Sequence, residues 1–451
     1  MKKTDLLVIG SGPGGFAAAV EAARRGASVT LAEKSGWGGT CTHWGCIPTK
    51  ALLAGSKRYD ETKKIGRLGI SFGEVGFDFP ALRKHMEQMV RVSALGTKKS
   101  LTEAGVDVLE GEAILKSPRE AAIERPGAGT ETVSCGRIVI AWGSRSTRPA
   151  GWNLSDRVVT STGFLARKEL PEKAIVVGGG AIGLEFATFL AELGKTVTVV
   201  ELLDQILPGE DTDAARFLEG ELKKKGVRFH TSARVDRIEE MPAGVRLTAT
   251  MATGQVILEG DLVLLATGRG PNLRKAELDR LSIAHDDGGI HIDKKFETSV
   301  PGIHAIGDIT GGLLLAHRAM AQGRALAAAL FGEGFPPHRD GDMPVVVYTH
   351  PGFGRVGITE GEARRRGLSL SVQRVEYGAN LTARTELLGP GFVKALFHEN
   401  RLAGVTVVGA SAAELIGSVS LPVTKRMAKK DLGAWVLPHP TLGEILSDFY
   451  R

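Results

Sequence analysis

The sequence predicts an α/β fold with two Rossmann-like dinucleotide-binding domains, followed by a C-terminal α+β domain. The chain has 451 residues, enough for about three domains. A glycine-rich strand–turn–helix segment near the N-terminus recurs 168 positions later, since Gly10 corresponds to Gly178. The region from about 335 onward reads as five strands with helices near 411–429 and 441–449, which is typical of a separate α+β domain.

Composition excludes several classes of protein. Hydrophobic residues make up 43% and charged residues 24%, a globular balance that excludes intrinsic disorder. The formal net charge is +6 and only 6% of residues are aromatic, so we expect no nucleic-acid partner. No apolar stretch reaches about 18 residues, so we expect no membrane span. The start, MKKTDLLVIG, has too short an apolar core for an export signal, and we expect a cytoplasmic protein.

The first dinucleotide-binding unit begins with an apolar strand at Leu6–Ile9. The motif Gly10-x-Gly12-x-x-Gly15 follows and opens an alanine-rich helix. The first glycine permits a tight turn, the second lets a pyrophosphate approach the backbone, and the third lets helix and strand pack closely. Glu33 ends the next strand, where a carboxylate can accept hydrogen bonds from a ribose diol.

The second unit repeats this pattern with Gly178-x-Gly180-x-x-Gly183. Glu201 ends its second strand, and a carboxylate there suits a free 2′-hydroxyl and repels a 2′-phosphate. The two residues that follow, Leu202 and Leu203, supply no arginine. The second unit is therefore predicted to prefer NAD over NADP.

Cys41 and Cys46 lie in the segment GGTCTHWGCIPTK, at the predicted start of a helix. Two thiols five positions apart can reach disulfide distance if the turn is loosened, and a helix N-terminus lowers the pKa of a thiol. The pattern favours a redox pair over a metal site with His43 as third ligand, because no second Cys/His pair occurs elsewhere. The third cysteine, Cys135, is expected to be a buried apolar thiol.

A second candidate lies near the C-terminus, in the segment PHPTLGE. His439 precedes Glu444 by five residues, so the carboxylate could hold the imidazole in one tautomer and make it a general base. A surface-loop histidine without a chemical role is the other interpretation of this segment.

Together these motifs resemble the FAD-dependent class I pyridine nucleotide–disulfide oxidoreductases, a family that includes dihydrolipoamide dehydrogenase, glutathione reductase and mercuric reductase. The resemblance covers nearly the whole chain. It rests on motifs that occur in the family's order: GSGPGG, GGTCTHWGCIPTK, GGGAIGLEFA, ATGRGPN, GDIT, THPGFGRVGITEGEA and HPTLGE.

The resemblance implies two cofactors, FAD and NAD, and no metal. Asp308 resembles the carboxylate that binds the flavin ribityl chain. The full set of residues implied to bind FAD or NAD is Gly10, Gly12, Gly14, Gly15, Glu33, Lys34, Gly39, Thr40, Lys50, Gly143, Gly307, Asp308, Gly178, Gly180, Gly183, Glu201 and Gly268.

The resemblance also assigns catalytic roles. Cys46 would be the thiol against the flavin, and Cys41 the thiol that meets the substrate. Lys50 would lie beside the flavin N5 with Glu185 as its ion-pair partner. The base would be His439 of the partner subunit, oriented by Glu444. Each active site would then need two chains, so we expect a homodimer.

The implied domain boundaries are residues 1–148 and 270–334 for the two parts of the FAD-binding domain, with the redox pair in the first part. The NAD-binding domain would span residues 149–269 and the dimerisation domain residues 335–451. A Gly- and Pro-rich linker is expected at 332–344.

Within the family, Glu201 and the stretch AHRA at 316–319 resemble the branch that oxidises dihydrolipoamide. That branch implies a lipoamide substrate on a carrier domain, and docking to the acyltransferase core of a 2-oxoacid dehydrogenase complex. An NAD(P)H-dependent reductase of another disulfide, such as glutathione disulfide, or of a metal ion remains the alternative. Trp142 departs from the family's usual threonine and is interpreted as a packing residue.

Overall fold

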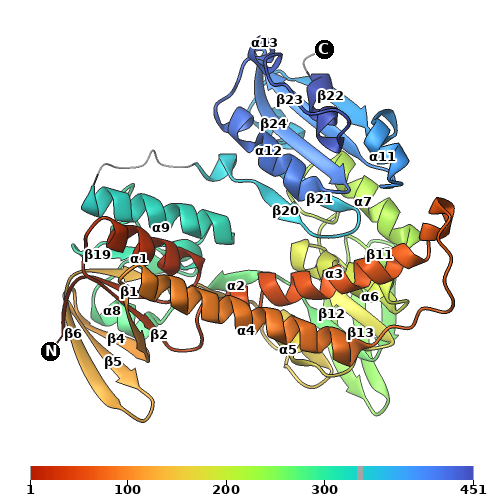
Figure 1. Cartoon of the computed structure of the whole chain (residues 1–451). Helices are drawn as coiled ribbons and strands as arrows, with labels where there is room; N and C mark the ends of the chain where they lie inside the picture. The colour runs from red at the N-terminus through yellow and green to blue at the C-terminus, as the bar shows by residue number, and fades with distance from the viewer. Residues whose placement is uncertain (1, 333–338, 450–451) are drawn as a thin grey trace. The chain divides into compact units, whose positions relative to one another are not determined.

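The computed structural model describes residues 2–332 and 339–449. The chain divides into two compact units, and each is described by itself (Figure 1). The first unit comprises Met1–Ala51, Ala81–Thr147 and Gly268–Asp340, and the second comprises Leu52–Pro80, Arg148–Thr267 and Gly341–Arg451. The expected boundary at 334/335 and part of the expected linker fall at 333–338, outside the described residues, so the four domain boundaries stay a prediction.

A seven-stranded sheet forms the centre of the first unit. Its strand order is β3-β2-β1-β6-β5-β4, and β19 also pairs with β6. The pairs β1–β2, β1–β6, β2–β3 and β6–β19 are parallel, whereas β4, β5 and β6 form an antiparallel extension. The strands are β1 (Lys2–Ile9), β2 (Val29–Glu33), β3 (Asp107–Glu110), β4 (Glu112–Ser117), β5 (Glu120–Arg125), β6 (Gly129–Ile140) and β19 (Ile303–Ala305).

Two helices lie side by side in this unit (Figure 1). They are α1 (Pro13–Arg24), which follows β1, and α9 (Ala316–Phe331). A side chain on Gly323 would lie 2.4 Å from the carbonyl oxygen of Gly14, so the two backbones approach too closely for any other residue.

The first unit also contains a ribbon and several shorter elements, and α4 and η3 are shared with the second unit. The two-stranded ribbon β7–β16 and the short helices η2 and α2 are the ones that matter below. The bounds are α2 (Gly39–His43), α4 (Phe79–Glu103), β7 (Ser144–Ser146), β16 (Arg269–Pro271), α8 (Lys275–Arg280), β17 (His285–Asp286), β18 (Gly289–Ile290), η2 (Gly307–Thr310) and η3 (Asp340–Asp342). Helix α3 (Cys46–Thr62) begins in the first unit and ends in the second.

The second unit contains a five-stranded parallel sheet in the order β11-β10-β9-β15-β8. An antiparallel sheet, β12-β13-β14, is inserted before β15. The elements are η1 (Ile65–Leu68), β8 (Val158–Thr160), α5 (Ser161–Ala166), β9 (Lys173–Val177), α6 (Ala181–Glu192), β10 (Thr196–Val200), α7 (Thr212–Lys224), β11 (Arg228–His230), β12 (Arg234–Met241), β13 (Gly244–Met251), β14 (Gly254–Gly260) and β15 (Leu262–Leu265).

The C-terminal part of the second unit is an antiparallel sheet, β20-β21-β24-β23-β22, with α12 packed on β21 and β24. All five strands expected there are confirmed. The segment expected to be helical at 441–449 is a 3₁₀ helix, in which Leu442 and Ile445, three positions apart, both pack on the core. The elements are β20 (Val345–Val347), β21 (Gly352–Gly357), α10 (Glu360–Arg365), β22 (Ser371–Glu376), η4 (Tyr377–Ala379), α11 (Leu381–Thr385), β23 (Phe392–His398), β24 (Arg401–Gly409), α12 (Ala412–Thr424), α13 (Lys429–Leu432) and η5 (Leu442–Phe449).

One buried cation joins the two parts of the second unit. The Lys394 side chain on β23 is 2% exposed, and its Nζ lies 2.9 Å from Asp211, 2.8 Å from Asp213 and 2.7 Å from Glu360. Burial opposes the charge, but the hydrogen bonds to these carboxylates prevail and raise the pKa of Lys394. Asp211 also caps α7 by accepting a hydrogen bond from the Ala214 N–H, so this ion cluster fixes the start of α7 against β23.

We predict that Lys394→Met lowers the free energy of unfolding by about 3 kcal/mol or more, because it leaves the buried Asp211 carboxylate without its cation. Thermal unfolding of the cofactor-loaded protein measures this change. Lys223→Met is the matched control: Lys223 pairs with Glu219 on the surface of α7, and its loss should change stability by less than about 0.5 kcal/mol. Equal melting temperatures for the two variants would contradict the assignment.

Candidate functional site

The first glycine-rich turn excludes side chains at two of its positions. Gly10 has φ +107°, and a Cβ there would lie 2.4 Å from the carbonyl oxygen of Ala141. A Cβ on Gly15 would lie 1.9 Å from the carbonyl oxygen of Gly10. A Cβ on Gly12 would meet nothing within 4 Å, so the backbone at the start of α1 is open to a ligand. This cradle fits a pyrophosphate, whose charge the positive end of α1 would stabilise.

The Glu33 carboxylate is held in place by the same turn. One oxygen accepts hydrogen bonds from the Ser11 N–H at 2.8 Å and the Ser11 hydroxyl at 2.7 Å, and the other accepts from the Ser35 N–H at 2.8 Å. The Ser11 hydroxyl in turn accepts from the Gly38 N–H at 3.0 Å, so it links β1 and β2 to the segment that carries the cysteines. Sequence analysis missed Ser11, although it lies within the GSGPGG motif.

Three other residues predicted to bind the cofactors make contacts within the protein itself. Gly14 faces Ala319, so its missing side chain serves the packing of α1 on α9. The Lys34 ammonium pairs with Glu112 at 2.9 Å. The Gly307 N–H donates to the Gln322 side chain at 2.7 Å, which fixes the turn before Asp308.

Four further predicted residues are exposed or partly exposed. Gly39 and Thr40 open α2, where a Cβ on Gly39 would lie 2.9 Å from the Gly12 Cα, beside the glycine-rich turn. Gly143 and Gly268 have φ values of +70° and +112°, a conformation that favours glycine. They precede the two strands of the β7–β16 ribbon.

Asp308, at the start of η2, accepts a hydrogen bond of 2.6 Å from the Ser144 hydroxyl. Ser144 also accepts from Arg269 at 2.9 Å, so the ribbon β7–β16 positions the carboxylate. Sequence analysis quoted the segment that contains Arg269 but gave neither residue a role, because a hydrogen bond between residues so far apart in sequence leaves no local pattern.

The second glycine-rich turn repeats the geometry of the first. A Cβ on Gly178 would lie 2.3 Å from the Ala266 carbonyl oxygen, and a Cβ on Gly183 would lie 2.0 Å from that of Gly178. Gly180 is open, as Gly12 is. The Glu201 carboxylate accepts from the Gly179 N–H at 2.6 Å and the Leu203 N–H at 2.8 Å. The two units therefore offer equivalent dinucleotide cradles.

The candidate redox pair is partly exposed and lies where α2 ends and α3 begins. The hydrogen bond with Cys46 and burial raise the pKa of the Cys41 thiol, while the charge of Lys50 acts in the opposite direction. Cys46 is the first residue of α3, where a helix N-terminus favours a thiolate.

The turn between the cysteines is closely packed. A Cβ on Gly45 would lie 3.0 Å from the Thr40 carbonyl oxygen. The His43 Nε2 lies 3.1 Å from the Trp37 carbonyl oxygen, so this ring is directed at the backbone. Within residues 2–332 and 339–449, no group of three or more His, Cys, Asp or Glu side chains is placed to hold a metal ion.

Lys50 belongs to the first unit and Glu185 to the second, and their ion pair stays a prediction. Glu185 is buried on α6, and its carboxylate accepts a hydrogen bond of 3.0 Å from the Tyr348 N–H. This bond fixes Glu185 against the start of the C-terminal sheet.

The structure brings His439 and Glu444 together. The His439 Nδ1 lies 2.9 Å from one Glu444 carboxylate oxygen, and the other oxygen accepts from the Thr441 N–H at 2.9 Å. The His439 side chain is 71% exposed, so its other ring nitrogen can meet a second molecule. The imidazole is therefore oriented as a general base requires.

Cys135 and Trp142 both belong to the core of the first unit. Cys135 is 5% exposed, and burial raises the pKa of its thiol to about 11, which confirms the expectation of an inert thiol. Trp142 packs against the same core cluster, and the Arg274 guanidinium lies 4.6 Å from its ring centre. The packing interpretation of Trp142 is confirmed.

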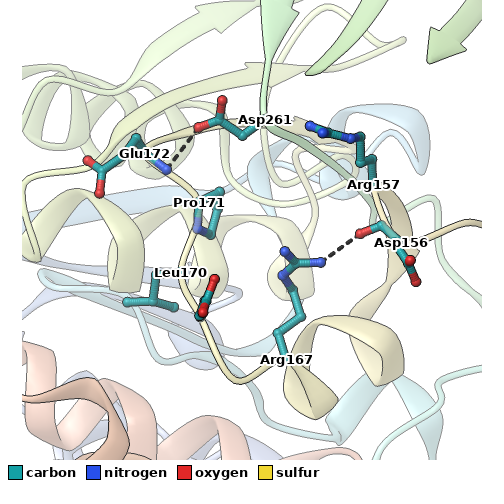
Figure 2. A pocket seen from close by; sticks show the side chains of 8 residues that line it. Asp156, Arg157, Arg167, Leu170, Pro171, Glu172 and Asp261 are labelled. Atoms are coloured by element: carbon teal, nitrogen blue, oxygen red, sulfur yellow. Dashed lines mark hydrogen bonds between the residues drawn. The ribbon is translucent and has the colours of Figure 1, made fainter. Parts of the chain in front are cut away.

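The second unit also has a hollow on its surface (Figure 2). The Arg167 guanidinium donates to the Asp156 carbonyl oxygen at 2.6 Å, and the Glu172 N–H donates to the Asp261 carboxylate at 3.0 Å. None of the predicted site residues lines it. Its lining is Asp156, Arg157, Arg167, Glu169, Leu170, Pro171, Glu172 and Asp261.

None of the helices among the described residues has both the length and the apolar composition needed to cross a bilayer.

Two dinucleotide cradles and a thiol pair on one chain define a thiol oxidoreductase that uses two nucleotides. Comparison with known proteins agrees: residues 4–323 match the pyridine nucleotide-disulphide oxidoreductase family, and residues 343–449 match that family's dimerisation domain. The chain belongs to this family. The cofactors expected from the sequence, FAD and NAD, are those of the family, and the dimerisation domain supports the expected homodimer.

Curated relatives match over the full length of the chain. Dihydrolipoyl dehydrogenase of Bacillus subtilis is 37% identical over 448 residues, covering 98% of this chain and 95% of the relative. The enzyme of the same name from Geobacillus stearothermophilus is 34% identical over 447 residues, covering 98% of this chain and 94% of the relative.

Solved structures show the same architecture. LpdA from Mycobacterium tuberculosis superposes with a TM-score of 0.92 at 27% identity, covering 100% of this chain and 99% of that one. A Cu(II) complex of RclA, an HOCl-induced flavoprotein disulfide reductase from Escherichia coli, has a TM-score of 0.88 at 29% identity, with coverage of 100% and 99%.

The environment of Glu201 predicts how nucleotide preference can be changed. Leu202, the next residue, is 62% exposed and offers no positive charge to a 2′-phosphate. We predict that Leu202→Arg tightens NADP⁺ binding about tenfold, equivalent to about 1.4 kcal/mol, with little change in NAD⁺ binding. Calorimetric titration with both nucleotides measures this, and neutral Leu202→Gln is the control. The role of Glu201 would be refuted if Leu202→Arg and Leu202→Gln tightened NADP⁺ binding equally. It would also be refuted if the wild-type protein bound both nucleotides equally.

Proposed function

We propose that this chain is a homodimeric dihydrolipoamide dehydrogenase, which oxidises a dithiol to its disulfide and passes hydride to NAD⁺. The observation that carries the proposal is the thiol pair at the start of α3, in which the pKa of Cys41 is raised and Cys46 is the first residue of the helix. The full-length similarity to dihydrolipoyl dehydrogenases supports the choice of substrate.

In this proposal FAD occupies the first cradle and NAD the second. The open backbone at Gly12 and the fixed Glu33 carboxylate would hold the pyrophosphate and the adenosine ribose of FAD. Asp308 would bind the ribityl chain of FAD. Gly180 and Glu201 would hold the pyrophosphate and the adenosine ribose of NAD in the same way. Bound FAD supplies the step that turns two electrons from thiols into a hydride for NAD⁺.

The thiol chemistry belongs to the chain's own residues. His439 of the partner subunit takes a proton from the substrate dithiol, while Glu444 keeps the imidazole oriented. The substrate thiolate attacks the Cys41 sulfur, which breaks the Cys41–Cys46 disulfide and leaves Cys46 as the thiolate. The second substrate thiol then loses its proton and attacks the substrate sulfur that is bonded to Cys41. The bond between Cys41 and the substrate breaks, the product leaves as a disulfide, and Cys41 takes up that proton.

The raised pKa of Cys41 accounts for the different roles of the two sulfurs. A thiol with a raised pKa readily takes up a proton once it is displaced, which suits Cys41 as the sulfur that exchanges with substrate. The other sulfur must hold the charge that is passed on, and the helix start at Cys46 stabilises it.

The remaining parts of the proposal concern partners and location. The substrate would be a lipoamide arm on a carrier domain, and the dimer would dock on the acyltransferase core of a 2-oxoacid dehydrogenase complex. A cytoplasmic location, as expected from the sequence, is part of the proposal.

The test is the rate of NAD⁺ reduction by dihydrolipoamide with the FAD-loaded protein. We expect Cys46→Ser and Cys41→Ser each to lose at least about a thousandfold in rate while FAD stays bound, because neither can form the disulfide. His439→Gln should slow dithiol oxidation about 100-fold or more but leave flavin reduction by NADH nearly unchanged. Cys135→Ala, in the core, is the control and should keep wild-type turnover.

Full dithiol activity in Cys46→Ser would overturn the mechanism. Inactivity of the wild type with dihydrolipoamide, combined with rapid NADPH-dependent reduction of glutathione disulfide or of a metal ion, would favour the reductase alternative. Equal slowing of both half-reactions in His439→Gln would remove its role as the base.

A further inference from the structure

One carboxylate beside the first dinucleotide cradle has no role in the function proposed above. Glu112 is the first residue of β4, and the paired strands β2 and β3 end just before it, at Glu33 and Glu110. The Gly111 N–H donates to the backbone carbonyl oxygen of Glu33 at 2.9 Å, and Glu112 is the next residue in the chain. Glu112 therefore lies at the end of the cradle that Glu33 marks.

Two cations hold the Glu112 side chain through the same oxygen. Its Oε1 accepts a hydrogen bond of 2.9 Å from the Lys34 Nζ and lies 3.0 Å from the Arg274 Nη2. The other oxygen, Oε2, accepts no hydrogen bond from any residue that the structure describes. The side chain is 44% exposed, so a bound molecule can reach this second oxygen.

Arg274 is itself fixed by several contacts in the first unit. Its Nη1 donates to the Ala113 carbonyl oxygen at 2.9 Å and lies 3.4 Å from a Glu277 carboxylate oxygen. Its guanidinium lies 4.6 Å from the centre of the Trp142 ring, a distance at which a cation is attracted to the ring face. Because Arg274 cannot move freely, the Glu112 oxygen that it contacts is held in place as well.

The Glu112 carboxylate stays ionised in this environment. The hydrogen bond from Lys34 holds the pKa of Glu112 below its ordinary value, and the charge of Arg274 acts in the same direction, whereas burial opposes both. An ionised carboxylate can only accept hydrogen bonds. The second oxygen therefore selects a ligand group that donates a hydrogen bond.

The function proposed above determines which part of a ligand meets this oxygen. If Glu33 binds the ribose diol of FAD, the adenine ring is attached to the same ribose, one carbon away from the diol. The side chains of Lys34 and Glu112 lie next to Glu33 on that side. Adenine carries a 6-amino group, which donates hydrogen bonds, whereas hypoxanthine carries an oxygen at this position, which accepts them.

We propose that Glu112 determines the base specificity of the first cradle: its Oε2 accepts a hydrogen bond from the 6-amino group of the FAD adenine, while Lys34 and Arg274 keep the carboxylate in position. The inference rests on the proposed function, because it requires FAD in the first cradle. No bond forms or breaks at Glu112. The contact contributes to the affinity for the cofactor and to the choice of base.

The experiment compares FAD with its hypoxanthine analogue, in which an oxygen replaces the 6-amino group of adenine. The full-length chain, freed of its flavin, is titrated with each compound, and flavin fluorescence gives the two dissociation constants. We expect the wild type to bind FAD at least about tenfold more tightly, because the oxygen of the analogue would face a carboxylate that cannot donate. Equal affinities for the two flavins would overturn the inference.

Glu112→Gln separates recognition from folding, because the two side chains have the same shape. The amide would turn its oxygen toward Lys34 and Arg274 and its NH₂ group toward the base. That donor suits the oxygen of hypoxanthine, so this variant should bind the analogue at least as tightly as FAD. A variant that keeps the wild-type preference for FAD would contradict the proposal.

Glu110→Gln is the matched control. Glu110 lies two positions before Glu112, and its Oε1 likewise accepts two hydrogen bonds, from Lys98 at 2.8 Å and from Trp37 at 3.1 Å. Its preference for FAD should stay within about twofold of the wild type, since loss of an exposed charge pair changes binding little. An equal change in Glu110→Gln and Glu112→Gln would show a general effect of charge and would remove the assignment.

A second readout covers a variant that does not take up flavin reversibly. The rate at which the loaded protein releases each flavin after dilution gives the same comparison, because differences in affinity between related complexes arise mostly in the dissociation rate. The wild type should release the analogue at least about tenfold faster than FAD, and Glu112→Gln should not.

The wild-type result also distinguishes this inference from the function on which it rests. Failure of the wild type to bind FAD at all would count against the proposed function. Tight FAD binding without a preference over the analogue would leave that function intact and remove only the role of Glu112.

Discussion

The close approach of helix and strand at each glycine-rich turn is the constraint on which the rest of the structure depends. A Cβ on Gly15 or Gly183 would lie 1.9 or 2.0 Å from a carbonyl oxygen of the same turn. Because no side chain fits, the first turn of each helix rests directly on the end of its strand. This contact directs the backbone N–H groups of the helix start toward one point, and it places Glu33 and Glu201 beside the same turns.

The redox pair depends on the first of these turns. The Ser11 hydroxyl lies between Glu33 and the Gly38 N–H, so the segment that leads into the cysteines is attached to the dinucleotide cradle by hydrogen bonds. Helix α3 then starts at Cys46 and separates the roles of the two sulfurs, since it favours charge on one while hydrogen bonding and burial keep the proton on the other. A cofactor in the cradle and a substrate at Cys41 would lie on opposite sides of the thiol pair.

The sequence predicted those parts of the molecule that depend on local backbone constraints. The glycines, Glu33, Glu201 and the cysteine pair lie in short motifs whose spacing reflects a single turn or helix start. The orientation of His439 by Glu444 was also predictable, because the two residues are only five positions apart. The family resemblance supplied the order of the domains and the two cofactors.

Contacts between distant segments could not be predicted. Ser144 and Asp308 are 164 positions apart, and Lys394 binds the carboxylate of Asp213, 181 positions away. Such pairs depend on the order of the strands in a sheet. The periodicity of hydrophobic residues in the sequence does not reveal that order. The 3₁₀ form of Leu442–Phe449 was missed for a related reason, since packing against the C-terminal core decides between two helix types with similar apolar patterns.

The central claim is that the Cys46 sulfur lies against the flavin ring of bound FAD. A crystal structure of the FAD-loaded dimer tests this most directly. We expect the Cys46 Sγ in van der Waals contact with the isoalloxazine ring, at about 3.5–4 Å, with Cys41 farther from it and His439 of the partner subunit facing Cys41. A flavin ring separated from both sulfurs by protein side chains, or a metal ion bound to the two sulfurs, would contradict the account.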